Sequence, residues 1–158
     1  KIIMPCGTGK SLAAFWIAKK MKVKKIIVAV PSLALLQQTL KVWTREFLIQ
    51  GINVDWLCVC SDASVKEDQD DFISYTYDLG IEVTTDSNQI KKFLGSYNKK
   101  IKVIFTTYQS GNVTAHGSKG YSFDLGIMDE AHKTVGYQDK LMAHLINQKI
   151  NSTQQLRV

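Results

Sequence analysis

The chain has 158 residues, of which 45% are hydrophobic and 22% charged, a composition typical of a globular domain large enough to bury a substantial core. No apolar run approaches the roughly 20 residues that a membrane-spanning helix needs, and the first residues lack the pattern of a secretory signal peptide. The net charge of +6 is compatible with a polyanionic partner but is weak support for one, because lysine-rich faces are usually just solvated.

Strands and helices are predicted to alternate along the chain. Apolar, β-branched runs indicate parallel strands covered on both faces, and apolar residues three and four apart indicate helices. Strands are expected at residues 1–4, 25–30, 53–60, 101–106 and 123–128, and helices at 10–20, 33–47, 86–97 and 139–148. The polar segment 62–71 is expected to be an exposed loop, and the glycine-rich segment 110–122 a mobile loop. This alternation predicts one α/β domain over residues 1–158, a three-layer α/β/α sandwich with a mainly parallel sheet.

A glycine-rich motif lies between the first expected strand and the first helix. Gly7 and Gly9 allow the backbone to approach a phosphate group closely, and the backbone N–H groups at the start of a helix attract anions. Lys10 is expected to reach the β- and γ-phosphates, and the Ser11 hydroxyl to ligate Mg²⁺. The predicted phosphate-binding residues are Cys6, Gly7, Thr8, Gly9, Lys10 and Ser11. Taken alone, the motif is also compatible with a glycine-rich turn before an ordinary helix.

Two adjacent carboxylates follow the strand expected at 123–128. Asp129 can hold Mg²⁺ directly or through water, and Glu130 can polarise the attacking water as a general base. An isolated Asp-Glu pair is compatible with a solvated loop. Its combination with an upstream phosphate loop indicates a site that hydrolyses a nucleotide.

Four candidate segments follow strands, and the carboxyl ends of parallel strands meet at one edge of a sheet. They are the phosphate loop, the segment at Pro31 and Ser32, the segment at Thr107 and Tyr108, and the carboxylate pair. We therefore expect one composite site at that edge.

These motifs resemble those of superfamily 2 helicases and translocases. Residues 6–11 and 129–132 are similar to motifs I and II, and in that superfamily the residue at the place of Met4 is often not glycine. Residues 30–37 resemble motif Ia, and residues 106–110 resemble a Thr-Tyr-x-Ser segment of restriction-enzyme-type members. The resemblance covers nearly the whole chain.

Two further segments narrow the resemblance. Residues 83–86 before a helix, and residues 129–134, are similar to large predicted helicases linked to restriction–modification systems, including type I and type III restriction subunits. The resemblance implies an N-terminal RecA-like domain with the P-loop NTPase fold. It also implies that ATP and Mg²⁺ are the cofactors of an ATP-dependent helicase or translocase.

The resemblance also implies roles for particular residues. Lys10, Asp129 and Glu130 would be catalytic, and His132 would couple the ATP site to its partners. The alternative for His132 is a packed histidine at a strand–helix junction. The implied nucleic-acid contacts are Pro31, Ser32, Thr107, Tyr108 and Gln109, for which loop capping and packing are the alternative. Gln37 is interpreted as structural, His116 as a loop histidine and His144 as a helix-surface histidine.

The implied partners are nucleic acid, with DNA favoured over RNA, and a second RecA-like domain of the same full-length chain that supplies arginines. No membrane partner is expected. The isolated domain is expected to bind ATP and Mg²⁺ weakly and to be nearly inactive. Two other classes remain open: a different P-loop NTPase such as a kinase or nucleotide switch, and a non-hydrolysing nucleic-acid-binding module.

Cysteines and lysines add little to this interpretation. Cys58 and Cys60 are expected to alternate along a strand, where a Cys-x-Cys metal site is the alternative to reduced thiols. No second Cys or His pair has metal-ligand spacing, so reduced thiols are expected. Reduced thiols are typical of a cytoplasmic protein, which is therefore the expected location. Five lysines at the end of the first helix are interpreted first as solubilising and capping residues, and second as a nucleic-acid patch: Lys19, Lys20, Lys22, Lys24 and Lys25.

Overall fold

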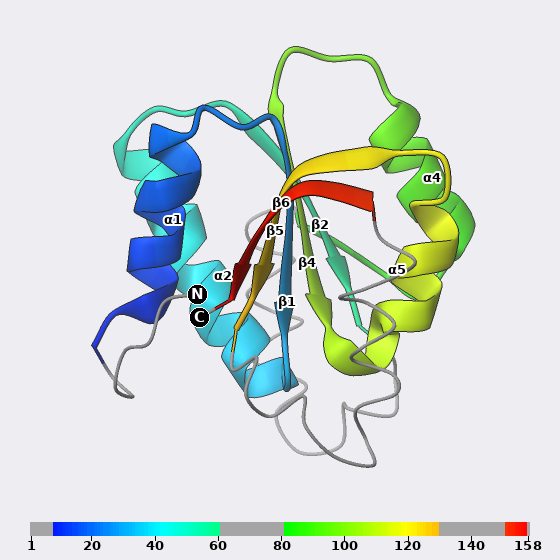
Figure 1. Cartoon of the computed structure of the whole chain (residues 1–158), viewed down its shortest axis with the longest axis horizontal. Coiled ribbons are helices and arrows are strands. Elements are labelled where there is room, and N and C mark those ends of the chain that lie inside the picture. Colours follow the sequence, from blue (N-terminus) through cyan, green and yellow to red (C-terminus); the bar gives the residue numbers. More distant parts are fainter. Residues whose placement is uncertain (1–7, 61–80, 130–150, 158) are drawn as a thin grey trace.

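The computed structural model describes residues 8–60, 81–129 and 151–157, which form a parallel sheet between two layers of helices (Figure 1). The helices are α1 Lys10–Lys20, α2 Leu33–Ile49, α4 Ser87–Gly95, the short 3₁₀ helix η2 Tyr108–Ser110 and α5 Gly111–Gly117. The strands are β1 Lys25–Val30, β2 Val54–Val59, β3 Glu82–Thr84, β4 Ile101–Thr107, β5 Ser122–Met128 and β6 Asn151–Arg157.

The sheet has the strand order β3-β2-β4-β1-β5-β6, and each neighbouring pair of strands is parallel. β1 lies between β4 and β5, with Ala29 opposite Thr106 on one side and Met128 on the other. This register brings the carboxyl ends of these three strands level with one another. The predicted α/β sandwich with a parallel sheet is therefore confirmed.

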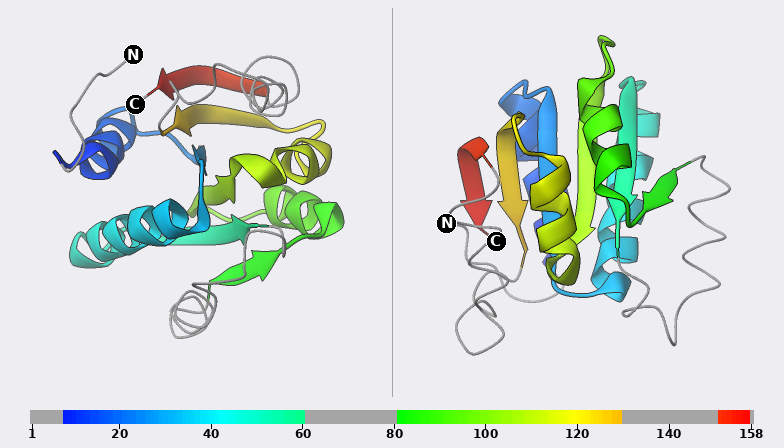
Figure 2. Two further views of the ribbon diagram at one scale, coloured as in Figure 1. Left: turned by 90° about the horizontal axis from the view of Figure 1, so that it is seen from below. Right: turned by 90° about the vertical axis from the view of Figure 1, so that its right-hand side faces the viewer.

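Helices α1 and α2 cover one face of the sheet, and α4 and α5 cover the other (Figure 2). Alternate residues of β1 take part in the two cores: Val28 belongs to the cluster with α1 and α2, and Ile27 to the cluster with α4 and α5. Both faces of β1 are thus buried, which is why its sequence is apolar at nearly every position.

Aromatic rings attach α1 and α2 to each other and to the sheet. Phe15 of α1 meets Trp43 and Phe47 of α2 edge to face, with ring centroids 5.4 and 5.1 Å apart. Trp43 also meets Phe105 of β4 at 5.7 Å. Such pairs stabilise a core beyond the area they bury. This packing fixes α1, whose amino end carries the phosphate-binding motif.

Lys102 joins the opposite helix layer to the sheet. This buried side chain of β4 donates hydrogen bonds to the carbonyl oxygens of Phe93 and Leu94, at 2.7 and 3.3 Å, and to that of Ser96. These carbonyls lie at the end of α4, where the helix has no internal donors for them. Burial lowers the pKa of Lys102, and the nearby ammonium of Lys25 lowers it further.

The prediction of a mobile loop at 110–122 is wrong. Residues 108–117 are helical and partly buried, and β5 begins at Ser122. The reason is that buried hydroxyls satisfy one another: Thr114 Oγ1 lies 3.0 Å from Thr106 Oγ1 and donates to the Ser110 carbonyl at 2.9 Å. Polar composition therefore did not indicate exposure here, and His116 is an exposed residue of α5 rather than of a loop.

The other predicted elements differ little from the observed ones, in the parts of the chain that the structure describes. The helix expected at 10–20 and the strand at 25–30 have the predicted bounds, whereas the helix expected to reach residue 97 ends at Gly95. The strand at 1–4, the loop at 62–71 and the helix at 139–148 lie outside the described residues. None of the described helices is long and apolar enough to cross a membrane.

Candidate nucleotide-binding site

The phosphate-binding motif enters α1 through a left-handed glycine. Gly9 has φ 84° and ψ 30°, a conformation that other residues rarely adopt. Its carbonyl accepts the first helical hydrogen bond, from the Ala13 amide at 2.9 Å. Lys10 and Ser11 consequently lie in the first turn, where helix N–H groups are not used within the helix. Thr8 and Gly9 are exposed, while Cys6 and Gly7 lie outside the described residues.

Asp129 lies directly after β5 and is held by its backbone on two sides. Its amide donates to the Ala29 carbonyl at 3.0 Å, and its carbonyl accepts from the Tyr108 hydroxyl at 2.6 Å. Asp129 is buried. The other predicted residues of this motif, Glu130 and His132, lie outside the described part of the chain.

One cavity of about 590 Å³ brings the two motifs together. Gly9, Lys10 and Ser11 line it from α1, and Asp129 lines it from the end of β5. The α2 residues along it include two cations, Lys41 and Arg45, and one anion, Glu46. Cations, helix N–H groups and a carboxylate in one cavity suit a phosphate ligand that carries a divalent cation.

Ser11 is bonded to α2 at both its side chain and its backbone. Its Oγ lies 3.3 Å from Thr39 Oγ1, and its carbonyl accepts from Trp43 Nε1 at 3.0 Å. Sequence analysis missed both contacts. Thr39 did carry a signal, since it is a polar residue on the helix face that buries Leu36, Leu40 and Trp43.

The segment after β1 emerges at the same edge of the sheet as Asp129. Ser32 is exposed and caps α2, because its Oγ accepts from the Leu35 amide at 3.3 Å. Pro31 and Gln37 are half-buried. The capping that was the alternative for Ser32 is therefore present, and its contact with nucleic acid stays a prediction.

Two of the predicted contact residues at the carboxyl end of β4 and in η2 are buried. Thr107 and Tyr108 are each 1% exposed. Thr107 Oγ1 lies 3.1 Å from Ser110 Oγ, and the Tyr108 hydroxyl binds the Asp129 carbonyl. Their side chains make the packing contacts that were the alternative to nucleic-acid binding. Gln109 is exposed and is the residue of this segment best placed for an outside partner.

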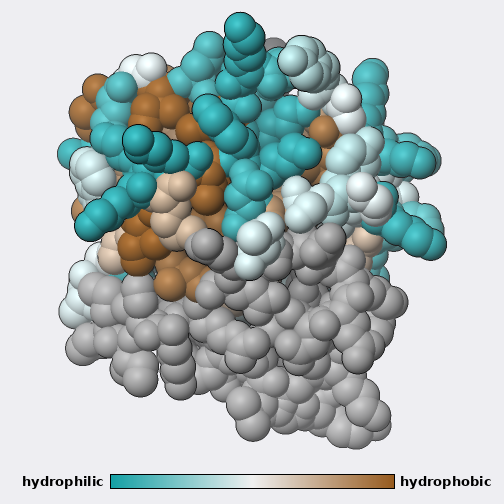
Figure 3. Space-filling view, turned by 45° about the horizontal axis from the view of Figure 1, so that its top comes forward, coloured by the Kyte–Doolittle hydropathy of each residue, from teal (hydrophilic) through white to brown (hydrophobic). Residues whose placement is uncertain are grey.

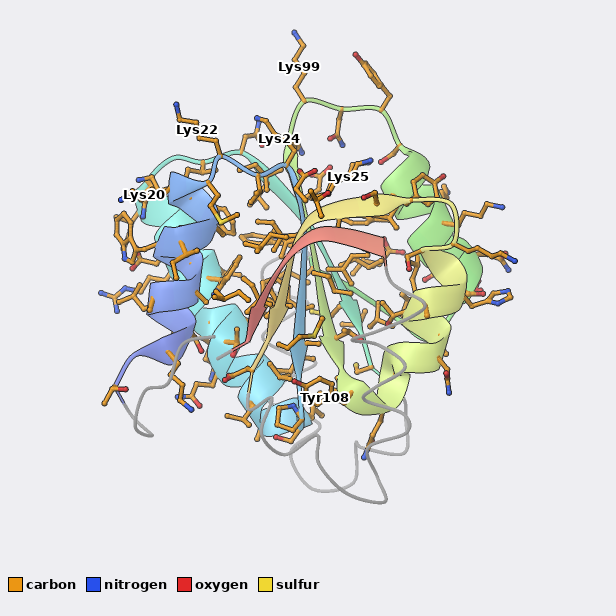
Figure 4. All side chains as sticks on the ribbon, viewed as in Figure 1. Lys20, Lys22, Lys24, Lys25, Lys99 and Tyr108 are labelled. Atoms are coloured by element: carbon orange, nitrogen blue, oxygen red, sulfur yellow. The ribbon has the colours of Figure 1, made fainter. Side chains whose placement is uncertain are left out.

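The lysine cluster lies away from this site. Four of its members lie at the amino ends of the strands, together with Lys99: Lys20, Lys22, Lys24 and Lys25 (Figure 4). Tyr108 lies at the opposite edge of the sheet. Lys19 and Lys20 occupy the last turn of α1, which agrees with a capping role. Figure 3 brings the lysine edge forward and shows hydrophobic side chains between hydrophilic ones. The lysines are therefore not part of the candidate nucleotide site.

The cysteines give no support for a metal centre. Cys58 and Cys60 are buried thiols. In the described ranges, no three His, Cys, Asp or Glu side chains are grouped so that they could hold a metal ion. Burial, with a smaller contribution from Cys60, raises the pKa of the Cys58 thiol far above its usual range, so this thiol stays protonated.

The parallel α/β sandwich, with a left-handed glycine leading into α1, is the architecture of a RecA-like P-loop domain. The family described as type III restriction enzyme, res subunit (ResIII), matches residues 1–158. The chain belongs to this family. A search of curated protein sequences finds no match.

Two solved structures resemble this chain. A nuclease-deletion mutant of the Type ISP restriction-modification enzyme LlaGI, in complex with a DNA substrate mimic, is 26% identical with a TM-score of 0.69. The match covers 99% of this chain but only 15% of that one. A de novo designed protein with the P-loop NTPase fold is 13% identical with a TM-score of 0.51, covering 85% of this chain and 84% of that one. The second likeness concerns the fold alone.

Proposed function

We propose that this domain is the ATP-binding part of a superfamily 2 motor that couples ATP hydrolysis to movement on DNA within a restriction–modification enzyme. The observation that carries the proposal is the cavity of about 590 Å³ that is lined by Lys10, Ser11 and Asp129. These residues come from distant parts of the sequence. Each has a chemical group that is suited to binding a nucleoside triphosphate with Mg²⁺. Their joint presence counts against a non-hydrolysing binding module.

In this proposal, some residues bind the nucleotide and Mg²⁺, and another accepts a proton. Lys10, with the N–H groups of the first turn of α1, binds the β- and γ-phosphates. The Ser11 hydroxyl and the Asp129 carboxylate are hard oxygen donors of the kind that Mg²⁺ prefers. ATP and Mg²⁺, when bound, supply the phosphoryl group and neutralise its charge. Glu130 accepts the proton of the attacking water.

The same sheet edge is the proposed place of contact with DNA. Pro31 and Ser32 follow β1, and the exposed Gln109 follows β4, so all three leave the sheet where Asp129 does. Hydroxyl, amide and backbone N–H groups suit phosphate contacts, which position a strand without reading its sequence. The DNA substrate mimic bound to LlaGI supports DNA over RNA. His132 would couple this edge to a second RecA-like domain. The buried thiols of Cys58 and Cys60 agree with the expectation of a reducing cytoplasm.

Two substitutions test the proposal in the full-length enzyme. Lys10→Ala should weaken ATP binding by at least about tenfold, because a charge-assisted phosphate contact is lost. Glu130→Gln should leave ATP binding near that of the wild type and stop turnover, because the amide cannot accept the proton. Nucleotide titration and phosphate release measure the two effects.

Lys20→Ala is the matched control, because this exposed lysine lies at the opposite edge of the sheet. This substitution should change neither the ATP affinity nor the rate of ATP turnover. Unchanged ATP affinity in the Lys10 variant would rule out the proposed role of this site.

A further inference from the structure

Two residues of helix α2 form hydrogen bonds with Ser11, at the amino end of α1. Thr39 and Trp43 are four positions apart and therefore lie one above the other on the same helix face. The first reaches the Ser11 side chain, at 3.3 Å between the hydroxyl oxygens, and the second donates to its carbonyl at 3.0 Å. The backbone and the hydroxyl of the proposed Mg²⁺ ligand are thus both attached to α2.

Thr39 differs from its neighbours on this face. It is 3% exposed, although a threonine hydroxyl is costly to bury unless it is hydrogen-bonded. It also lies at the inner end of the site, where Lys10, Ser11, Asp129 and Thr39 line a second small cavity. Trp43 lines the same cavity, and its ring also packs against Phe15 and Phe105 in the aromatic core. The hydroxyl of Thr39 is therefore placed toward the site rather than toward the core alone.

The bond between Thr39 and Ser11 is compatible with metal ligation. A serine hydroxyl has one proton and two lone pairs, so Ser11 can give one lone pair to a cation and still donate to, or accept from, Thr39. An isolated serine side chain divides its time among three staggered rotamers. A hydrogen bond to a buried partner reduces this freedom before the ligand arrives, which lowers the cost of binding.

We propose that Thr39 is a positioning residue that orients the Ser11 hydroxyl toward Mg²⁺. This inference rests on the proposed function, in which Ser11 is the Mg²⁺ ligand. Thr39 lies about two helical turns after Ser32, which begins the same helix at the proposed DNA-binding edge. One rigid helix therefore contacts both the nucleotide site and the segment proposed to meet DNA.

The test uses the full-length enzyme and the Mg²⁺ concentration that gives half-maximal ATP turnover. Thr39→Val keeps the shape of the side chain but removes its hydroxyl, and should raise this concentration by about tenfold, the lower end of what loss of a ligand-orienting partner costs. ATP binding measured without Mg²⁺ should stay unchanged. Thr39→Ser keeps the hydroxyl and should restore the wild-type Mg²⁺ dependence.

Thr44→Val is the matched control. Thr44 is buried on the same helix, and its hydroxyl donates to the Leu40 carbonyl at 2.8 Å, within α2 itself. The control should leave the Mg²⁺ dependence unchanged. Should the valine variant at position 39 fail to fold, Thr39→Ala removes the same hydroxyl without the added methyl group.

Two outcomes would overturn the proposal. One is a hydroxyl-free variant of Thr39 with the Mg²⁺ dependence of the wild type. The other is an equal shift in Thr44→Val, which would reduce Thr39 to a role in helix stability. Failure of the underlying function is a separate result, because Lys10→Ala would then bind ATP like the wild type.

Discussion

At the residue scale, the least expected side chain is Tyr108. The resemblance to restriction-type helicases placed it against nucleic acid, yet its ring is buried and its hydroxyl binds the backbone carbonyl of Asp129. A buried phenol needs a hydrogen-bond partner, and the carboxyl end of β5 offers one. From η2, which follows β4 on the other side of β1, Tyr108 therefore holds in place the residue proposed to ligate Mg²⁺.

Removal of this hydroxyl should weaken the fold locally. Tyr108→Phe keeps the ring but leaves the buried Asp129 carbonyl without this donor, which should lower the free energy of unfolding by about 1–2 kcal/mol. The midpoint of urea unfolding, with an unchanged slope, measures the loss. Tyr97→Phe is the control, because Tyr97 is 99% exposed and should change stability by less than about 0.5 kcal/mol. Equal stability of the two variants would contradict this account of Tyr108.

At the element scale, the packing of α5 against α4 is the main departure from the sequence-based prediction. The polar, glycine-rich sequence of residues 110–122 predicted a loop. Instead, part of it forms α5, and Gly117 allows this helix to approach α4 closely. A Cβ atom at Gly117 would lie 2.6 Å from Ile90 Cβ and 2.6 Å from the Ser87 carbonyl oxygen. The glycine is therefore required by the helix contact rather than by chain flexibility.

A methyl group at this contact should be destabilising. Gly117→Ala should lower the free energy of unfolding by about 1–3 kcal/mol, because backbone and a branched side chain must move apart. Gly95→Ala is the control: its nearest neighbour is the end of the Tyr121 side chain, at 2.7 Å from the added Cβ, which can rotate away. Thermal unfolding of both variants distinguishes the two cases. A gain in stability at Gly117 would show that the helices are not in close contact there.

At the scale of the whole molecule, the chain corresponds to only a small part of the LlaGI chain. The chain spans 15% of the length of the LlaGI chain that it matches. In related phosphoryl-transfer chemistry, an arginine supplied from outside the nucleotide-binding domain contributes about 10³–10⁵ in rate. We therefore expect the activity of the proposed motor to depend on residues outside this domain.

The isolated 158-residue chain should accordingly be a poor ATPase. We expect weak binding of ATP with Mg²⁺ and slow hydrolysis that added duplex DNA does not stimulate. Phosphate release by the isolated chain and by the full-length enzyme, at equal concentrations and with and without DNA, gives the comparison. Robust DNA-stimulated turnover by the isolated chain would show that it holds a complete site.

Local patterns in the sequence were sufficient for most of the architecture. The apolar runs of β1, β4 and β5 and the helical spacing along α2 predicted the parallel sandwich, because burial on both faces leaves few polar positions in a central strand. The motifs at Lys10 and Asp129 predicted a composite site at one edge of the sheet, and both residues line one cavity there. The binding of phosphate and metal by this site stays a prediction.

Only the tertiary structure decided which residues support that site. Thr39 and Ser11 are 28 positions apart, and Tyr108 and Asp129 are 21 apart, so neither bond has a local sequence signature. In α5, Thr114 is buried because its hydroxyl lies 3.0 Å from the Thr106 hydroxyl of β4 and donates to the Ser110 carbonyl of η2. Hydrogen bonds between distant segments depend on how the elements pack, and a single sequence read in order does not contain that information directly.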